Sequence, residues 1–173
     1  MSAKDDFKKR VQQGSVNREN LENKVKSDIQ FFRARLYELV KEIEGWLHNT
    51  GVKTDVINAP YTDESIDSLP EVKHLSNYKA SFVTINNGMK SASLVPLGVY
   101  GGDASGWCRL LVQKSSDVEK FLLKLKKDDH TWTIKREVDL TTISYLAAHR
   151  PMTPPEQELT EDTFFQAIAD IAD

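Results

Sequence analysis

The chain has 173 residues, of which 39% are hydrophobic and 28% are charged, and its formal net charge is −3. This length and composition suit one globular domain and argue against an intrinsically disordered chain. The small net charge argues against strong binding to nucleic acids or membranes by bulk electrostatics. Counting Lys and Arg against Asp and Glu, residues 1–50 carry +2, 51–70 carry −3, 71–150 carry +4 and 151–173 carry −6.

The sequence predicts a cytoplasmic protein that does not enter a membrane. Its N-terminus, MSAKDDFKKR, lacks the apolar segment of a secretory signal, and no run approaches the roughly 18 apolar residues that span a bilayer. The single cysteine, Cys108, excludes an internal disulfide and favours a reducing compartment.

Residues 1–15 are polar and end at Gly14-Ser15. A mobile arm and a short frayed helix both fit such a segment. We therefore predict a mobile N-terminal arm over residues 1–15 and a single α+β domain over residues 16–173.

The clearest periodic element is predicted over residues 18–48. Its apolar residues are spaced alternately four and three apart, at Val25, Ile29, Phe32, Leu36, Leu39, Ile43 and Trp46. Such a helix would be about 45 Å long at 1.5 Å per residue, so part of it would extend beyond a small domain. The bulk of Phe32 and Trp46 favours packing on a sheet. The alternative is a homodimer through the Val25–Trp46 helix.

Residues 52–77 have mixed character. Val52 to Ile57 predict an edge strand that Asn58-Ala59-Pro60 ends. Asp63, Glu64 and Asp67 then form an acidic connection, which we interpret as a solvated loop. A metal site is disfavoured because the calcium-loop pattern and a second ligand cluster are absent.

The stretch from Tyr78 to Gln113 predicts a three-stranded antiparallel core. Residues 78–85 are rich in β-formers, Asn86-Asn87-Gly88 favours a tight reversal, and residues 89–97 return. A glycine-rich loop, Gly98–Gly106, then precedes a third strand over residues 107–113. In the same stretch, Cys108 between strand residues is typical of a buried, inert thiol.

Residues 114–136 fit either a helix or a hairpin, and we favour a hairpin that turns at Lys127–His130. Leu140 to Ala148 is an apolar segment compatible with a strand or a short helix. A final helix is predicted from Thr160 as N-cap, with Leu159 and Phe164 at the positions of a hydrophobic staple.

Asp128, Asp129 and His130 form the tightest cluster of titratable residues, of the kind used in acid–base catalysis. In a turn, however, Asp and His are common for conformational reasons. None of the four histidines has a zinc-ligand spacing. We therefore predict no metal and no cofactor, and the sequence leans against an enzyme.

The glycine-rich loop is the better candidate for partner binding. It lacks the phosphate-binding pattern GxxxxGK[ST], but it brings aromatic residues between small ones, which suits rigid contact surfaces. The predicted partner-binding residues are Tyr100, Asp103, Trp107 and Arg109. The alternative is a wide hairpin loop that needs glycine only for its backbone conformation.

Nucleic-acid binding would use a basic stretch in which Trp132 stacks on a base. Acidic residues largely cancel its charge, so nucleic acid is the less favoured partner. The basic residues are Lys120, Lys124, Lys126, Lys127, Lys135 and Arg136.

The sequence predicts an α+β fold, in which a long N-terminal helix packs on a mainly antiparallel sheet of five or six strands, with a short C-terminal helix. The predicted function is a non-enzymatic protein-interaction domain, such as a small regulator or an inhibitor of the immunity or antitoxin type. The alternatives are a small hydrolase or nuclease with the Asp-Asp-His cluster, and a nucleic-acid-binding domain.

Overall fold

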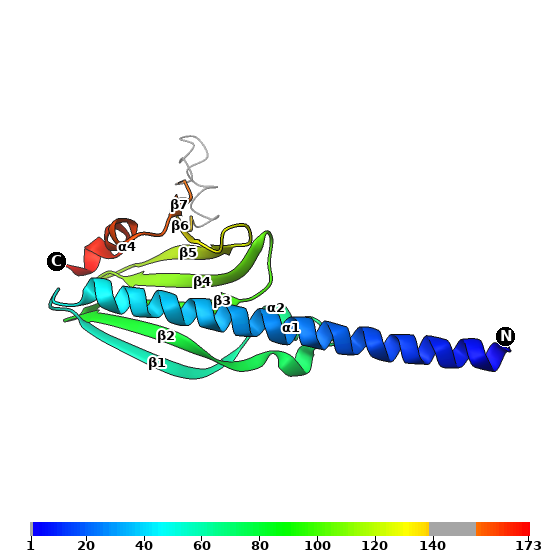
Figure 1. Ribbon diagram of the computed structural model, residues 1–173. Helices are drawn as coiled ribbons and strands as arrows, with labels where there is room; N and C mark the ends of the chain where they lie inside the picture. The colour runs from blue at the N-terminus through cyan, green and yellow to red at the C-terminus, as the bar shows by residue number, and fades with distance from the viewer. Residues whose placement is uncertain (1, 139–154) are drawn as a thin grey trace.

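The computed structural model describes residues 2–138 and 155–173. A long N-terminal helix, an antiparallel sheet of seven strands and a short C-terminal helix make up the fold (Figure 1). The predicted α+β class is confirmed. The apolar segment Leu140–Ala148 lies outside the described residues.

Helix α1 spans Ala3–Leu47 and packs one face on the sheet. The hydroxyl of its N-cap Ser2 accepts a hydrogen bond from the Asp5 backbone N–H, and the Asp5 carboxylate accepts one from the Ser2 backbone N–H, which forms a capping box. All the predicted stripe residues except half-buried Trp46 are buried against the chain's own sheet. The helix ends at Leu47, within one residue of the predicted end, and Asn49 and Gly51 then take left-handed conformations.

The predicted break at Gly14-Ser15 is wrong, because α1 runs through both residues. A glycine inside a helix costs about 1 kcal/mol relative to alanine, but it does not by itself end the helix. Gly14 also has no neighbouring atom within 4 Å of an added Cβ, so the space at this position would admit a larger side chain.

Among the described residues, each strand pairs with the next along the chain, so the sheet is a meander in the order β1 to β7. The core predicted over residues 78–113 and the hairpin predicted over residues 114–136 are confirmed. The seventh strand is a two-residue addition to the five or six expected. The strands are β1 (Lys53–Thr62), β2 (Asn77–Asn87), β3 (Lys90–Gly98), β4 (Ala104–Gln113), β5 (Val118–Lys126), β6 (Trp132–Arg136) and β7 (Gln157–Glu158).

Strand β1 does not stop at Asn58-Ala59-Pro60, in contrast to the prediction. It is the edge strand, so only one side of its backbone pairs. Asp63 N donates to Ser76 O at 2.8 Å, which continues the register of the β1–β2 ladder. Odd-numbered β1 residues therefore bond to β2, whereas Pro60 turns its nitrogen outward, where proline is tolerated.

The core lies between α1 and one sheet face, where Leu94, Leu110 and Leu123 stand on neighbouring strands. Helix α4 (Glu161–Ile168) and the 3₁₀ turn η2 (Ala169–Ile171) extend this core. The predicted cap at Thr160 is confirmed, and the Phe164 ring lies 5.5 Å from the Trp46 ring.

The acidic connection after β1 is folded, which corrects the prediction of a solvated loop. It contains helix α2 (Glu64–Asp67) and the 3₁₀ turn η1 (Lys73–Leu75). Ile66 and Val72 are fully buried in the core, and the Asp63 side chain is also fully buried.

Candidate protein-interaction surfaces

The glycine-rich loop is tied to the domain by its aromatic residues. The Tyr100 hydroxyl donates to the Asp28 carboxylate of α1 at 2.6 Å, and Trp107 Nε1 donates to Gly101 O at 3.0 Å. Burial, together with the Asp28 carboxylate, raises the pKa of Tyr100. Tyr100 and Trp107 therefore hold the loop against the rest of the domain. Asp103, in the same loop, is highly exposed, with 81% of its side chain accessible.

Arg109 faces away from the α1-covered side of the sheet, because buried Cys108 and Leu110 on either side of it point toward the core. Its guanidinium forms two hydrogen bonds to Glu137, at 2.7 and 2.9 Å. Since Tyr100 reaches α1 instead, the four predicted partner-binding residues do not form one contact surface. Cys108 is fully buried, and burial raises the pKa of its thiol, which suits an inert side chain.

The buried carboxylate of Asp63 holds the start of the glycine-rich loop. It accepts hydrogen bonds from the Ser65 backbone and hydroxyl, from the Tyr78 hydroxyl at 2.7 Å and from Val99 N at 3.0 Å. An added Cβ on Gly98 would lie only 2.7 Å from this carboxylate. The Asp-x-Ser spacing was the local sign of a helix cap, but only the fold brings Tyr78 and Val99 to it. The site is a structural link with all its bonds formed inside the chain.

Asp128, Asp129 and His130 are exposed in the β5–β6 turn. The Asp129 carboxylate accepts hydrogen bonds from Thr131, and these lower the pKa of Asp129 to about 2. His130 has a left-handed backbone, and its carbonyl accepts a hydrogen bond from Arg35 of α1 at 2.6 Å. The cluster therefore shapes the turn and docks it on α1, and its geometry does not favour acid–base catalysis.

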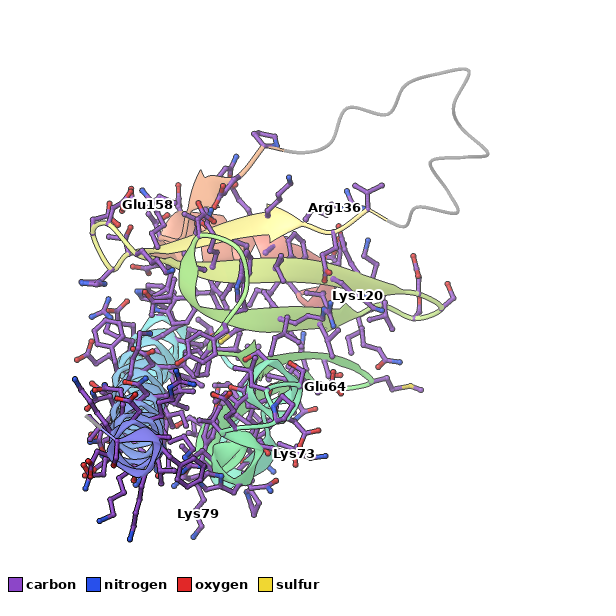
Figure 2. All side chains as sticks on the ribbon, turned by 90° about the vertical axis from the view of Figure 1, so that its right-hand side faces the viewer. Glu64, Lys73, Lys79, Lys120, Arg136 and Glu158 are labelled. Atoms are coloured by element: carbon purple, nitrogen blue, oxygen red, sulfur yellow. The ribbon has the colours of Figure 1, made fainter. Side chains whose placement is uncertain are left out.

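The basic stretch does not combine with Trp132, which corrects that prediction. Trp132 is only 7% exposed and belongs to the core beside Leu125, so it cannot stack on a base at the surface. Lys124 contacts Glu156, and Arg136 contacts Glu119, at 3.1 and 2.6 Å. Figure 2 shows Lys120 and Arg136 on strands away from α1.

The N-terminal part of α1 projects beyond the sheet as a helical arm, which we define as Ala3–Asn20 (Figure 1). Every residue of the arm is exposed. Phe7 is 68% exposed and Val11, one turn later, is 54% exposed. Val16 is 49% exposed but lies on the opposite side of the helix, because nine residues at 100° bring it half a turn from Phe7.

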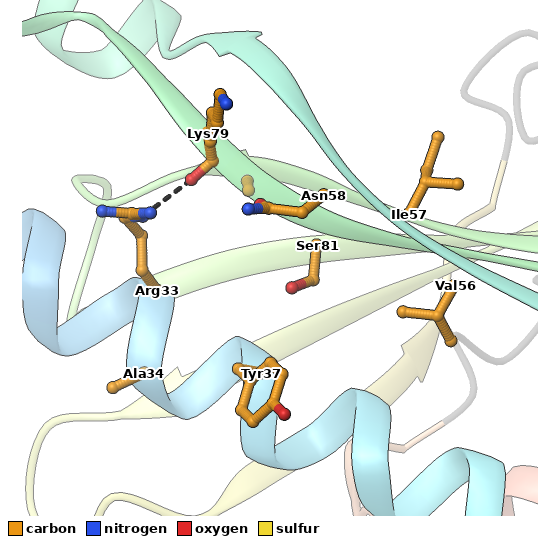
Figure 3. Close-up of a pocket in the computed structure, with 9 residues that line it drawn as sticks. Arg33, Ala34, Tyr37, Val56, Ile57, Asn58, Lys79 and Ser81 are labelled. Carbon is orange, nitrogen blue, oxygen red and sulfur yellow. Dashed lines mark hydrogen bonds between the residues drawn. The ribbon is translucent and has the colours of Figure 1, made fainter.

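A groove of about 430 Å³ separates α1 from the edge of the sheet. Arg33, Ala34 and Tyr37 line it from the helix. Figure 3 shows Val56 directed toward the helix and Ile57 directed away from it. The sheet side of the groove consists of Val56, Ile57, Asn58, Lys79, Ala80 and Ser81.

A second groove, of about 530 Å³, lies at the C-terminal end of α1. It is mostly apolar, and its walls come from the end of α1, the residues that follow it, and the α4–η2 segment. Leu47, Val52, Phe165 and Ile168 line it, among others.

Within residues 2–138 and 155–173, no group of three or more His, Cys, Asp or Glu side chains is placed to hold a metal ion. In the same part of the chain, no helix is long and apolar enough to cross a membrane. No protein-family model, no curated protein and no solved structure matches the chain.

Proposed function

We propose that the protein is a non-enzymatic protein-interaction domain that inserts its helical arm into a groove of a protein partner. The observation that carries this proposal is the projection of Ala3–Asn20 into solvent with exposed Phe7 and Val11. A small regulator, or an inhibitor of the immunity or antitoxin type, is the class we favour, because such proteins act by binding alone.

The arm is preorganised for helical recognition. An isolated helix of this length is marginal in water, but this one extends a packed helix and carries a capping box at Ser2 and Asp5. The ordering cost of binding is therefore reduced. A partner groove would bury Phe7 and Val11, with about 1.5–3 kcal/mol gained for each fully buried side chain.

The charges of the arm define the groove that it fits. At helical spacing, Lys4, Lys8 and Arg10 flank the Phe7–Val11 side, while Asp5 and Asp6 lie behind it. A complementary groove would have an apolar floor and an acidic rim. Electrostatic matching of this kind mainly accelerates association and excludes wrong partners.

The test is an affinity pull-down from native lysate with tagged protein at physiological salt, with parallel lanes treated with nuclease. A double variant, Phe7→Ser with Val11→Ser, removes the apolar side of the arm. Val16→Ser is the matched control, because it changes a similarly exposed residue on the opposite side. We expect one stoichiometric protein that resists nuclease, is retained by the control and is lost with the double variant.

Two outcomes would contradict the proposal. A partner retained equally by the double variant would show that the arm is not the binding surface. Bands that disappear with nuclease would point to nucleic acid. Far-UV circular dichroism of all variants checks that the domain remains folded.

A further inference from the structure

The outer edge of β1 offers unpaired backbone groups. The register that pairs odd-numbered β1 residues with β2 turns the N–H and C=O groups of Thr54, Val56 and Asn58 outward. Within residues 2–138 and 155–173, no strand pairs with this edge. Pro60 is the next outward-facing residue and has no N–H to donate. The edge can therefore pair over Thr54–Asn58 before proline limits it.

The groove beside α1 lies directly next to this edge. Side chains that oppose each other in an antiparallel ladder share one face of the sheet. Residues of an added strand that pair with Val56 and Asn58 would thus direct their side chains toward Ala34 and Tyr37 across the groove (Figure 3). The space exists because Ala34 and Ser81 are small, and the groove would receive small apolar side chains.

The charged side chains at this groove are cationic. Arg33 and Lys79 are both exposed, and Arg33 Nε donates to the Lys79 carbonyl at 2.7 Å, which holds the guanidinium at the groove (Figure 3). No acidic side chain lines the groove. A carboxylate on the groove-facing side of the added strand would meet the Arg33 guanidinium, whereas the Lys79 amino group is directed away from the helix (Figure 3).

We propose that β1 binds an extended acidic segment of a partner protein by strand addition. Backbone hydrogen bonds to Thr54, Val56 and Asn58 supply the pairing. On the face of the added strand that enters the groove, small apolar side chains fit beside Ala34 and a carboxylate pairs with Arg33. A second copy of this chain is disfavoured as the occupant, because the groove-facing residues of β1, Thr54, Val56 and Asn58, include no carboxylate for Arg33. This site is independent of the helical arm, and either can fail without the other.

The probe is a fluorescein-labelled nonapeptide with valine at positions 3, 5 and 7 and glutamate at positions 1 and 9, which all share one face of a strand, and threonine at the even positions; its binding to the full chain is followed by fluorescence anisotropy. The matched probes are the same peptide with lysine in place of both glutamates, and the acidic peptide with a central proline. We expect saturable binding of the acidic peptide, binding at least about tenfold weaker for the lysine peptide, and none for the proline peptide. Arg33→Gln should reduce the difference in dissociation constant between the glutamate and lysine peptides.

Two variants test the edge itself, and a third tests the groove. Asn58→Pro removes one outward N–H and should abolish binding, whereas Pro60→Ala adds one and should strengthen binding several-fold. Ala34→Phe fills the groove from an exposed position on α1 and should weaken binding without altering the edge. If Asn58→Pro fails to fold by circular dichroism, Ala34→Phe and Pro60→Ala decide the result.

The proposal is overturned if the three peptides bind equally, if none binds, or if the variants leave the dissociation constant unchanged. It is also overturned if light scattering shows a dimer that Asn58→Pro dissociates, because the edge would then belong to a second copy.

Discussion

Asp63 and Tyr78 show how single polar residues organise this molecule. Their side chains meet inside the domain at 2.7 Å, and the Asp63 carboxylate also accepts the Val99 backbone N–H. One carboxylate thereby connects the end of β1, the start of β2 and the loop after β3. A buried carboxylate is costly unless it is fully hydrogen-bonded, and here four donors serve it.

This buried cluster predicts a loss of stability at alkaline pH. Burial, followed by the hydrogen bond to Asp63, raises the pKa of Tyr78 above the ordinary value of 10.0. The folded protein then keeps the phenol proton where the unfolded chain has lost it. The stabilisation is complete below pH 10 and is lost as the pH rises toward the folded-state pKa, by up to about 1.4 kcal/mol per pH unit.

Urea unfolding between pH 7 and pH 11 measures this loss. Tyr78→Phe should be less stable than wild type at pH 7, because it lacks the hydrogen bond to Asp63, but should lose less stability above pH 10. Tyr37→Phe is the control, since this tyrosine is 54% exposed and should follow the wild-type curve. Parallel curves for Tyr78→Phe and wild type would refute the prediction.

At the scale of elements, α1 has two distinct parts. Its second half buries a continuous stripe against the sheet, and its first half, the helical arm, is exposed. The sequence pattern alone left open whether the stripe was core or dimer interface. Because the stripe is covered by the chain's own sheet, a homodimer through Val25–Trp46 would have to displace that sheet.

The variant Leu36→Asp distinguishes a core role of the helix stripe from a role as a dimer interface. Leu36 is fully buried, so an aspartate there would place an unpaired charge in the core and cost about 3–5 kcal/mol or more. Such a loss is comparable to the total stability of many domains, and we expect the variant to be unfolded by circular dichroism. Tyr37→Asp, at the exposed neighbouring position, should remain folded. A Leu36→Asp protein that is folded and has merely changed its oligomeric state would identify the stripe as an interface.

At the scale of the whole molecule, the helical arm should unfold locally more readily than the core. Among the described residues, all buried apolar side chains except Ala104 belong to one core cluster, whereas residues 3–20 are exposed. Amides of the arm should exchange with deuterium at least about 100-fold faster than those of β2–β4, because the arm can unwind without opening the core.

Deletion of residues 2–17 should change the free energy of unfolding by less than about 0.5 kcal/mol. Strong protection of the arm, or a large loss on deletion, would mean that it packs in solution.

Local patterns were sufficient for many elements. The β-rich runs around Asn86-Asn87-Gly88 predicted the β2–β3 hairpin, and Thr160 with Phe164 predicted α4. These signals succeed because turn and cap residues act on their immediate neighbours. They fail at Pro60 and Gly14. Pro60 does not end its strand, because it lies on an edge strand where its nitrogen needs no partner. Gly14 does not end its helix, because its helix-forming penalty is small and the helix continues into a packed segment.

The candidate sites depended more on tertiary structure. Trp132 and the nearby lysines are close in sequence, yet the pleat of β6 turns the indole into the core. Arg33 and Lys79 are far apart in sequence, yet α1 brings them together at one groove. No local spacing encodes such a contact.

The sequence by itself determined the α+β class, the amphipathic helix, the hairpins and the final cap, because each of these follows from periodicity or from residues within one turn of each other. Only the tertiary structure decided which side chains and strand edges are exposed and which are buried. It covered the helix stripe, buried Asp63 and Trp132, and left the helical arm and the β1 edge without partners among the described residues. Exposure depends on contacts between distant segments, and those contacts exist only once the chain has folded.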